Sequence, residues 1–290
     1  MNERRGFLRW NPAAWLRISG DDAFAFLQGQ FTNDLRGMVA GQAVYGLWLN
    51  HKGKVLADSF VLKGAAAEFW VGSYFSPAAT IKDRLEAFII ADDVIVEDVT
   101  AQWSGVTVFE PNNMTQRQLP SAVEFALAGR RIADPHREWI FPAKAWSHVQ
   151  TALMDLPELS AGYVERWRIE DAIPAVPADL GPGELPNEGG LEVAAISYTK
   201  GCYLGQEVMA RLKAMGQVRR QLMRLGGSGP IPVLPAPLFQ GDRRIGELRT
   251  ASGQGNSFLG LALLSRLHLD ENKGLSFSPG GDLVLTVIAA

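Results

Sequence analysis

Short apolar segments separated by turn-forming residues fill the first third of the chain, and they limit the possible folds more than any other feature. Residues 43–49, 54–62 and 69–72 have the length and the Val, Leu, Phe and Trp content of strands. Between them lie Asn-His-Lys-Gly at residues 50–53 and Gly-Ala at residues 64–65, which have the composition of hairpin turns. Successive hairpins of this kind predict an antiparallel sheet.

Helical patterns alternate with these strands. Apolar residues recur at helical spacing in residues 21–35, behind an acidic start, and again after Ser76. Alternation without long parallel crossovers favours an α+β fold over a doubly wound parallel sheet. Further strands are expected at residues 94–99 and 106–109, and further helices at residues 143–153 and 165–170.

Glycine and proline concentrate at residues 226–237, which predicts a domain boundary at residue 226. Beyond this stretch, residues 244–250, 257–264 and 282–289 alternate or run apolar at strand length, with glycine-rich turns between them. We therefore predict that the C-terminal part of the chain forms a small all-β barrel.

Composition narrows the classes of function. The 290-residue chain is 47% hydrophobic and 20% charged, so it has ample material for packed cores. Its formal net charge of -3 gives no overall basic surface, and no direct binding of nucleic acid is predicted. The sequence has no signal-peptide pattern and no run of about 18 apolar residues, so we expect a cytoplasmic protein without a membrane partner.

The only cysteine, Cys202, cannot form a disulfide within the chain or supply an all-cysteine metal site. It lies in KGCYLGQE at residues 200–207, just before a predicted helix whose first turn contains Glu207. The Lys200 ammonium and the unpaired N–H groups of a helix N-terminus both favour a thiolate over a thiol. A reactive thiol and a buried structural cysteine both remain open, and so does a pair with His51. The four histidines show no metal-ligand spacing, so no metal site is predicted.

Several segments together resemble the YgfZ family of folate-binding proteins, which are related to the T-protein, the aminomethyltransferase of the glycine cleavage system. They are FLQGQFTNDL at residues 26–35, NHKGKVLAD at 50–58, Arg-Ile-Glu at 168–170 followed by LPNEGGL at 185–191, and KGCYLGQE at 200–207. The resemblance implies a ring of domains around a central hole that binds tetrahydrofolate or a one-carbon derivative.

The fold implied by this resemblance is α+β and T-protein-like. Residues 1–225 would form the folate-binding region, with two mixed subdomains of antiparallel sheet and helices, and residues 226–290 the C-terminal β-barrel. The implied function is that of an accessory protein in iron-sulfur cluster assembly or repair, which indirectly supports cluster-dependent enzymes of tRNA thio-modification. Iron-sulfur proteins or assembly factors would be its partners.

The resemblance also implies roles for individual residues. Glu170 matches the T-protein position that recognises the pterin edge, where paired donors suit a bidentate carboxylate. An exposed helix glutamate is the alternative for Glu170, and ordinary solvated charges are the alternative for the basic candidates. The other candidate folate ligands are Arg211, with Lys213 beside it, Lys54, and the motif residues Gly201, Tyr203 and Gln206.

One departure from the T-protein pattern puts aminomethyl transfer in doubt. T-proteins carry paired aspartates after the glycine hairpin, whereas this chain has Ala57-Asp58. The candidate catalytic residues are therefore Cys202, Lys200 and Asp58, and whether the protein turns over a substrate stays open. Two alternatives to the accessory function also remain: a folate-dependent one-carbon transferase that depends on Asp58, and a scaffold without chemistry.

Overall fold

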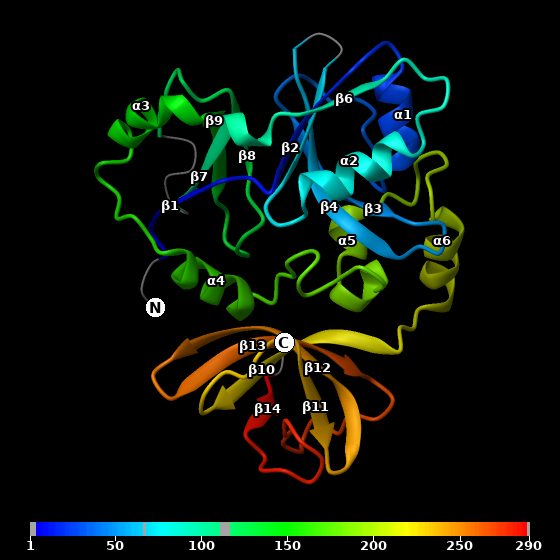
Figure 1. Ribbon diagram of the computed structural model, residues 1–290, viewed down its shortest axis with the longest axis vertical. Helices are drawn as coiled ribbons and strands as arrows, with labels where there is room; N and C mark the ends of the chain where they lie inside the picture. The colour runs from blue at the N-terminus through cyan, green and yellow to red at the C-terminus, as the bar shows by residue number, and fades with distance from the viewer. Residues whose placement is uncertain (1–3, 66–67, 111–116, 289–290) are drawn as a thin grey trace.

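Three antiparallel sheets and a connecting helical layer make up the structure (Figure 1). The computed structural model describes residues 4–65, 68–110 and 117–288. The first two sheets lie side by side at the top of the view, and the third lies below them. This arrangement confirms the predicted α+β class with antiparallel pairing.

The first sheet is built from the predicted hairpin region. Its strand order is β3-β4-β5-β2-β6, and all neighbouring strands are antiparallel. Helices α1 and α2 bury their apolar residues in one core with these strands. The elements are β2 (Ala14–Ser19), α1 (Ala23–Gln30), β3 (Ala43–Leu49), β4 (Val55–Lys63), β5 (Phe69–Ser73), α2 (Ala78–Glu86) and β6 (Ile95–Asp98).

Helix α1 begins where the acidic start predicted it, with Asp22 as its N-cap, but ends at Gln30 and not at residue 35. Phe31 is already extended, with φ -89° and ψ 142°. The next backbone N–H, that of Thr32, donates to the carbonyl oxygen of Leu47 at 3.2 Å. The chain leaves the helix because pairing with β3 takes over its backbone hydrogen bonds.

The second sheet has the order β1-β7-β9-β8 and packs against α3. An aromatic cluster joins it to the first sheet: Trp103 of β7 lies 5.8 Å from Trp15 of β2 and 5.1 Å from Trp70 of β5, between ring centroids. The elements are β1 (Gly6–Trp10), η1 (Thr100–Gln102), β7 (Trp103–Phe109), β8 (Phe125–Ala128), β9 (Arg137–Pro142), η2 (Ala143–Ala145) and α3 (Trp146–Thr151).

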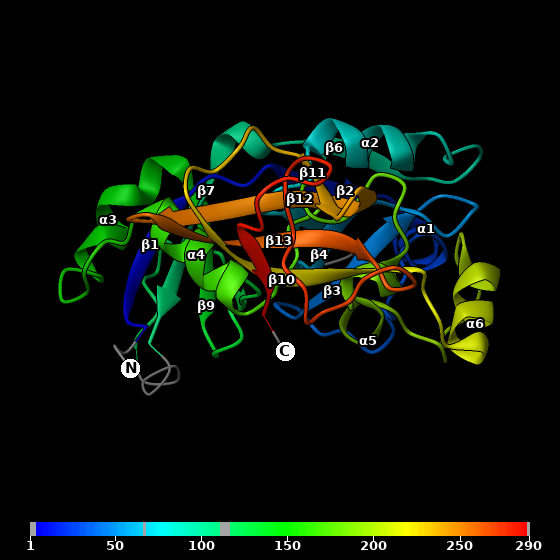
Figure 2. The ribbon, with the colours of Figure 1, turned by 90° about the horizontal axis from the view of Figure 1, so that it is seen from below.

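A helical layer connects these sheets to the third sheet. Helix α4 packs against β12 and β13, which lie nearer to the viewer than α4 when the molecule is seen from below (Figure 2). The irregular stretch after α4 contains short helices, and α6 stands at the edge of the molecule (Figure 1). The elements are α4 (Ala161–Glu170), η3 (Pro186–Gly189), α5 (Glu192–Ala195) and α6 (Gln206–Met215).

The third sheet, with order β11-β12-β13-β10-β14, curls into a half-barrel. Bridges of Ser276 to Phe239 and of Leu275 to Leu285 connect its two edge strands. Residues 226–228, predicted as linker, lie inside β10, so the chain is paired strand there. The division at residue 226 stays a prediction. The strands are β10 (Arg220–Ser228), β11 (Ala236–Gln240), β12 (Arg243–Gln254), β13 (Ser257–Ser265) and β14 (Leu285–Val287).

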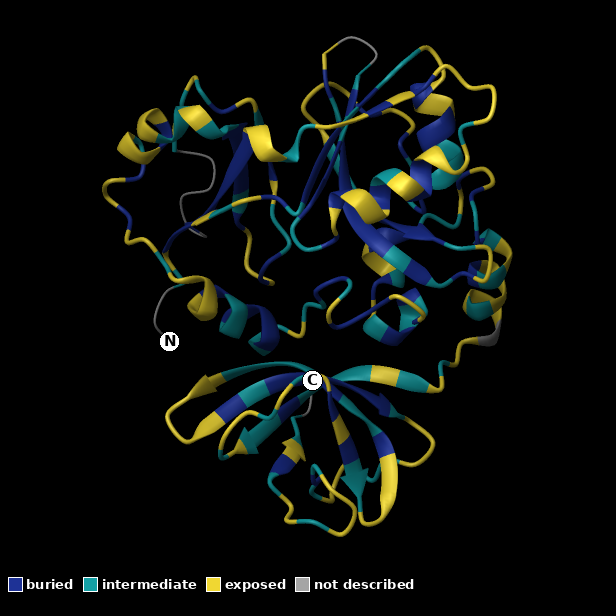
Figure 3. Ribbon diagram, viewed as in Figure 1, coloured by how far each residue is buried: buried dark blue, intermediate teal, exposed yellow. Residues whose placement is uncertain are grey.

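The buried residues lie mainly in the sheets and in the helical layer between them. Figure 3 shows buried residues concentrated along the strands of the first two sheets and along the inner part of α4, with exposed residues on α3, α6 and the outer loops. The three sheets thus enclose the middle of the molecule, where the segments of α4, β1 and the turn after β5 meet.

Candidate functional site

A cavity of about 530 Å³ lies in this central region, between β1, α4 and the turn after β5. Three aromatic side chains, Trp10, Tyr74 and Phe75, form much of its wall. A volume of this size suits a small-molecule ligand. The remaining lining residues are Leu8, Arg9, Asn11, Arg131, Ala161, Gly162, Val164, Glu165 and Arg168.

The cavity wall is held from behind by Glu138 of β9, which is fully buried. Its carboxylate accepts hydrogen bonds from Trp10 Nε1 at 3.1 Å, from the Tyr74 hydroxyl at 2.7 Å and from the Thr107 hydroxyl at 2.8 Å. The Arg131 guanidinium lies 3.6 Å away. A buried carboxylate with this many partners ties both sheets to the cavity wall.

Helix α4 turns different residues to the cavity and away from it. Glu165 and Arg168, one turn apart, line the cavity, whereas Glu170 lies about 160° round the helix from Arg168, given about 100° per residue. Glu170 borders a separate hollow with Arg166 and Trp167. Its carboxylate pairs with Arg4 at 3.2 Å and with Arg166 at 3.1 Å. The pterin role of Glu170 stays a prediction, and its placement does not bring it into the central cavity.

Arg168 joins the cavity to the third sheet. Its guanidinium donates to Glu165 at 2.6 and 2.9 Å, and to Asp179 at 2.6 Å. Thr250 of β12 accepts from Arg168 at 3.2 Å and donates to Asp179 at 2.6 Å. Burial raises the pKa of Asp179, and the charge of Arg168 opposes that rise. Arg168 and Asp179 thus form a buried pair that connects α4, the segment after it and β12.

Asp58 of β4 is buried behind the turn that supplies Tyr74 and Phe75. The hydroxyls of Ser73 and Ser76 donate to its carboxylate at 2.8 and 2.7 Å, and the Tyr45 hydroxyl donates at 3.0 Å. Burial raises the pKa of Asp58, while the serine hydrogen bonds oppose that rise. The structure therefore surrounds Asp58 with protein hydroxyls, and its catalytic role stays a prediction.

Asp58→Asn should change how stability depends on pH. Because the pKa of the carboxyl is higher in the folded than in the unfolded protein, the folded state keeps a proton that the unfolded state loses as pH rises above 3.8. Wild-type stability should fall across that window, up to the folded-state pKa, and the variant should lack this fall. Urea denaturation at several pH values between about 4 and 8 measures it. A constant difference between variant and wild type over that range would contradict the expectation.

The cysteine motif folds against the hairpin of the first sheet, as close contacts of two glycines show. Gly205, the N-cap of α6, has φ +87°, and a Cβ there would lie 2.9 Å from the carbonyl oxygen of Asn50. A Cβ on Gly53 would lie 2.9 Å from side-chain atoms of Met209 and Val208. The predicted helix is present and starts at Gln206. Cys202 precedes this helix and is exposed, which excludes the alternative of a buried structural cysteine.

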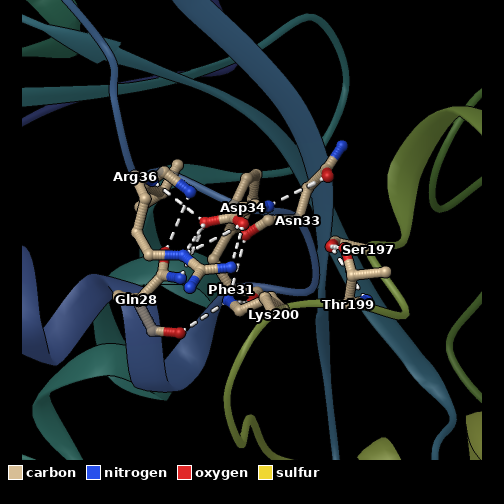
Figure 4. Close-up of polar contacts among 9 residues, drawn as sticks. Gln28, Phe31, Asn33, Asp34, Arg36, Ser197, Thr199 and Lys200 are labelled. Carbon is tan, nitrogen blue, oxygen red and sulfur yellow. Dashed lines mark hydrogen bonds and ion pairs between the residues drawn. The ribbon is translucent and has the colours of Figure 1, made fainter.

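Lys200, by contrast, is buried, with 5% of its surface exposed. Its ammonium donates to the carbonyl oxygens of Gln28 and Phe31, each at 2.6 Å, and of Asn33 at 3.0 Å (Figure 4). Burial lowers the pKa of Lys200 to about 8, so the ammonium is still largely protonated at neutral pH. All three donors are used at the C-terminal end of α1, where a cation is favoured. The geometry shows a clamp on α1, and the tuning of Cys202 by Lys200 stays a prediction.

Lys200→Met should therefore act on stability. Loss of three charge-assisted hydrogen bonds should lower the free energy of unfolding by about 2 kcal/mol, measured by urea denaturation. Lys52→Met, in the exposed turn after β3, is the control and should stay within about 0.5 kcal/mol of wild type. The pH dependence of Cys202 alkylation in the Lys200 variant separates the two roles. An unchanged midpoint fits a clamp, and a raised midpoint would support thiolate tuning.

The residues predicted to bind folate do not surround one cavity. Gly201, Gln206 and Arg211 lie in the cysteine motif or on α6, with Tyr203 buried beneath them, and Lys54 lies beside β4 in the neighbouring hairpin. Helices α4 and α6 are far apart in both views (Figures 1 and 2). None of these five residues lines the central cavity. Their role in binding folate stays a prediction.

Sequence reasoning missed the residues that form the centre of the site. Trp10, Tyr74, Arg131 and Glu138 belong to segments far apart in the chain, and they meet only through the packing of β1, β9 and the turn after β5. One local signal could have identified Glu138: it is a charged residue inside a strand-like segment, REWIFP. A charge at such a position indicates a buried partner.

No group of three or more His, Cys, Asp or Glu side chains in residues 4–65, 68–110 and 117–288 is placed to hold a metal ion. No helix in the same ranges has the length and apolar content needed to cross a membrane.

Comparison with known proteins identifies relatives that cover most of the chain. The family model described as GCVT N-terminal domain matches residues 6–116. The mouse protein "Iron-sulfur cluster assembly factor IBA57, mitochondrial" is 29% identical over 281 residues, covering 88% of this chain and 76% of the relative. The Vibrio vulnificus "tRNA-modifying protein YgfZ" is 25% identical over 255 residues, covering 82% and 75%.

A solved structure supports the fold. The aminomethyltransferase T of the glycine cleavage system from Bartonella henselae superposes with a TM-score of 0.77 over 99% of this chain and 86% of that one, at 16% sequence identity. The T-protein-like fold predicted from the sequence is thus confirmed. With the matched domain, the two sets of relatives and the shared fold taken together, the chain is similar to the YgfZ and IBA57 proteins and has the fold of the glycine cleavage T-protein, as the sequence resemblance predicts.

Proposed function

We propose that this protein is a folate-binding accessory factor in iron-sulfur cluster assembly or repair, and that it supports tRNA modification indirectly through cluster-dependent enzymes. The names of its relatives, an iron-sulfur cluster assembly factor and a tRNA-modifying protein, support both parts. The central cavity is the observation that carries the folate part. The formal net charge of -3 gives no support to direct contact with RNA.

The central cavity fits a folate in size and chemistry. Trp10, Tyr74 and Phe75 offer aromatic surfaces for a flat pterin ring. Glu165 would accept hydrogen bonds from the paired N–H donors of the pterin, since it stands on the cavity face of α4. Arg9, exposed at the wall of the same cavity, would pair with the glutamyl carboxylate. A bound folate would contribute its one-carbon group, and these side chains would hold and orient it.

Calorimetry with tetrahydrofolate and 5-formyltetrahydrofolate tests this site. A matched pair of variants, Glu165→Gln and Glu170→Gln, separates the cavity from the position that the family resemblance points to. We expect the Glu165 variant to weaken binding roughly tenfold to hundredfold and the Glu170 variant to change it little. If Glu170→Gln weakens binding and Glu165→Gln does not, Glu170 and not Glu165 binds the pterin. No heat with folded wild-type protein would remove the folate part of the proposal.

Cys202 would act at the surface, away from the central cavity. It is exposed on the loop before α6 and does not line the cavity. Because one thiol cannot hold a cluster alone, it would share iron ligation with cysteines of a partner protein during transfer. The cluster in this scheme is cargo that passes between proteins, and the bound folate would act at a distance from the thiol.

Cys202→Ser should abolish support of a cluster-dependent enzyme in a complementation assay, while folate binding and stability stay within error of wild type, because the side chain is exposed. Asp58→Asn in the same assay tests the alternative, a one-carbon transferase of the T-protein type. That alternative predicts folate-dependent turnover and greater dependence on Asp58 than on Cys202. Full complementation by Cys202→Ser would favour a scaffold without thiol chemistry.

A further inference from the structure

A second cavity, of about 520 Å³, lies beside the cysteine motif and shares no residue with the central one. It lies between the segment that contains η3 and α5, helix α6, and the facing strands of the third sheet. Its lining residues are Asn187, Glu192, Val193, Ile196, Tyr198, Leu212, Lys213, Gly216, Gln217, Val218, Gln221 and Arg266. Neither the folate site nor the exposed thiol uses this cavity.

Two buried acceptors in this cavity lack donors. The Oδ1 atom of Asn187 and the Oε2 atom of Glu192 are both buried, and neither has a hydrogen-bond partner among the described residues. Leaving such a group unsatisfied is costly, and a carboxylate costs more than an amide. Burial and, after it, the negative charge of Glu192 raise the pKa of the Tyr198 hydroxyl, and a hydrogen bond with the Asn187 side chain opposes that rise. A ligand ammonium would supply the donors that these two oxygens lack.

Two cations stand on the other side of the same cavity. The Lys213 ammonium lies 4.2 Å from the centre of the Tyr198 ring. Arg266 is exposed at the end of β13. Within the described residues, neither Lys213 nor Arg266 forms an ion pair with an acidic side chain within 4.0 Å. They are free to bind an anionic group.

One tyrosine, Tyr198, lies near both charged regions. Tyr198 carries Lys213 over its ring and has its hydroxyl in the field of Glu192. A ligand that carries both an ammonium and a carboxylate would complement the two regions. Between them, Ile196, Leu212 and Val218 supply apolar wall for an aliphatic side chain.

We propose that this cavity binds a free α-amino acid with an aliphatic side chain. The ammonium would donate to Glu192 and Asn187, the carboxylate would accept from Lys213 and Arg266, and the side chain would lie against Ile196, Leu212 and Val218. The site would thus have partners for both the ammonium and the carboxylate of the ligand. A simple amine or a simple carboxylic acid would use only one of these two sets of partners.

Calorimetry and thermal unfolding with L-leucine and L-methionine at millimolar concentrations test the proposal. Isoamylamine lacks the carboxylate and isocaproate lacks the ammonium, so both should bind far more weakly than leucine. Glu192→Gln should weaken leucine binding roughly tenfold to hundredfold, and Lys213→Met should weaken it as well. Glu271→Gln, at an exposed acidic residue outside the cavity, is the control and should bind as wild type does.

The outcomes are separable from those for the proposed function. Cys202→Ser should bind leucine normally, and 5-formyltetrahydrofolate, whose glutamate nitrogen is an amide, should not compete. Lack of leucine and methionine binding, or binding unaffected by Glu192→Gln, would overturn the proposal whatever the folate experiments show. Binding of isoamylamine as tight as that of leucine would overturn the amino-acid assignment. Preference for a leucine-initiated peptide over leucine would overturn a free amino acid in favour of a protein partner.

Discussion

Replacing Arg168 by methionine is expected to lower the free energy of unfolding by about 3–5 kcal/mol. The change removes the partner of Asp179, which is 0% exposed, and leaves that carboxylate uncompensated. It also removes the link between α4 and Thr250 of β12. Urea denaturation followed by circular dichroism measures the loss.

The matched control is Arg17→Met, which breaks an exposed pair with Glu97. That pair should be worth about 1 kcal/mol or less, because water screens it. Combining Arg168→Met with Asp179→Leu should recover part of the stability, because the second substitution removes the buried carboxylate that the first leaves unpaired. Equal losses for the Arg168 and Arg17 variants would contradict a special role for the buried pair.

Glu138→Leu is expected to cost a similar amount, about 3–5 kcal/mol, for a different reason. The variant leaves the Trp10 indole, the Tyr74 hydroxyl and the Thr107 hydroxyl without their acceptor, and Arg131 without its counter-charge. Because Trp10, Tyr74 and Arg131 line the central cavity, folate binding should fall together with stability. Chemical denaturation and calorimetry on the same preparation measure both.

Two variants refine this expectation. Glu138→Gln keeps an oxygen that can accept some of these hydrogen bonds, so its loss should be smaller than that of the leucine variant. Glu124→Leu replaces an exposed glutamate just before β8 and should change stability by no more than about 0.5 kcal/mol. A Glu138→Leu protein as stable as the Glu124 variant would show that the network does not hold the cavity wall.

Local pattern predicted the elements that turn-forming residues delimit. The hairpin strands β3, β4 and β5 were predicted almost to the residue, because turn-forming residues separate them. β1 and β2 were not predicted, although they are central to the architecture: the chain passes from one sheet to the other between them, and no local signal marks that crossing. The predicted linker at residues 226–228 is strand, because β13 and β14 pair with it from either side.

The candidate site shows the same contrast between features marked by local sequence and features that depend on long-range packing. The sequence by itself determined the family resemblance, the single thiol and the helix that follows it, because these depend on residues close together in the chain. Only the tertiary structure decided that Lys200 holds the end of α1, that Glu165 and not Glu170 faces the central cavity, and that Glu138 gathers its partners there. Hydrogen bonds and cavities join residues more than a hundred positions apart, and their partners are chosen by the packing of sheets, which a linear pattern does not encode.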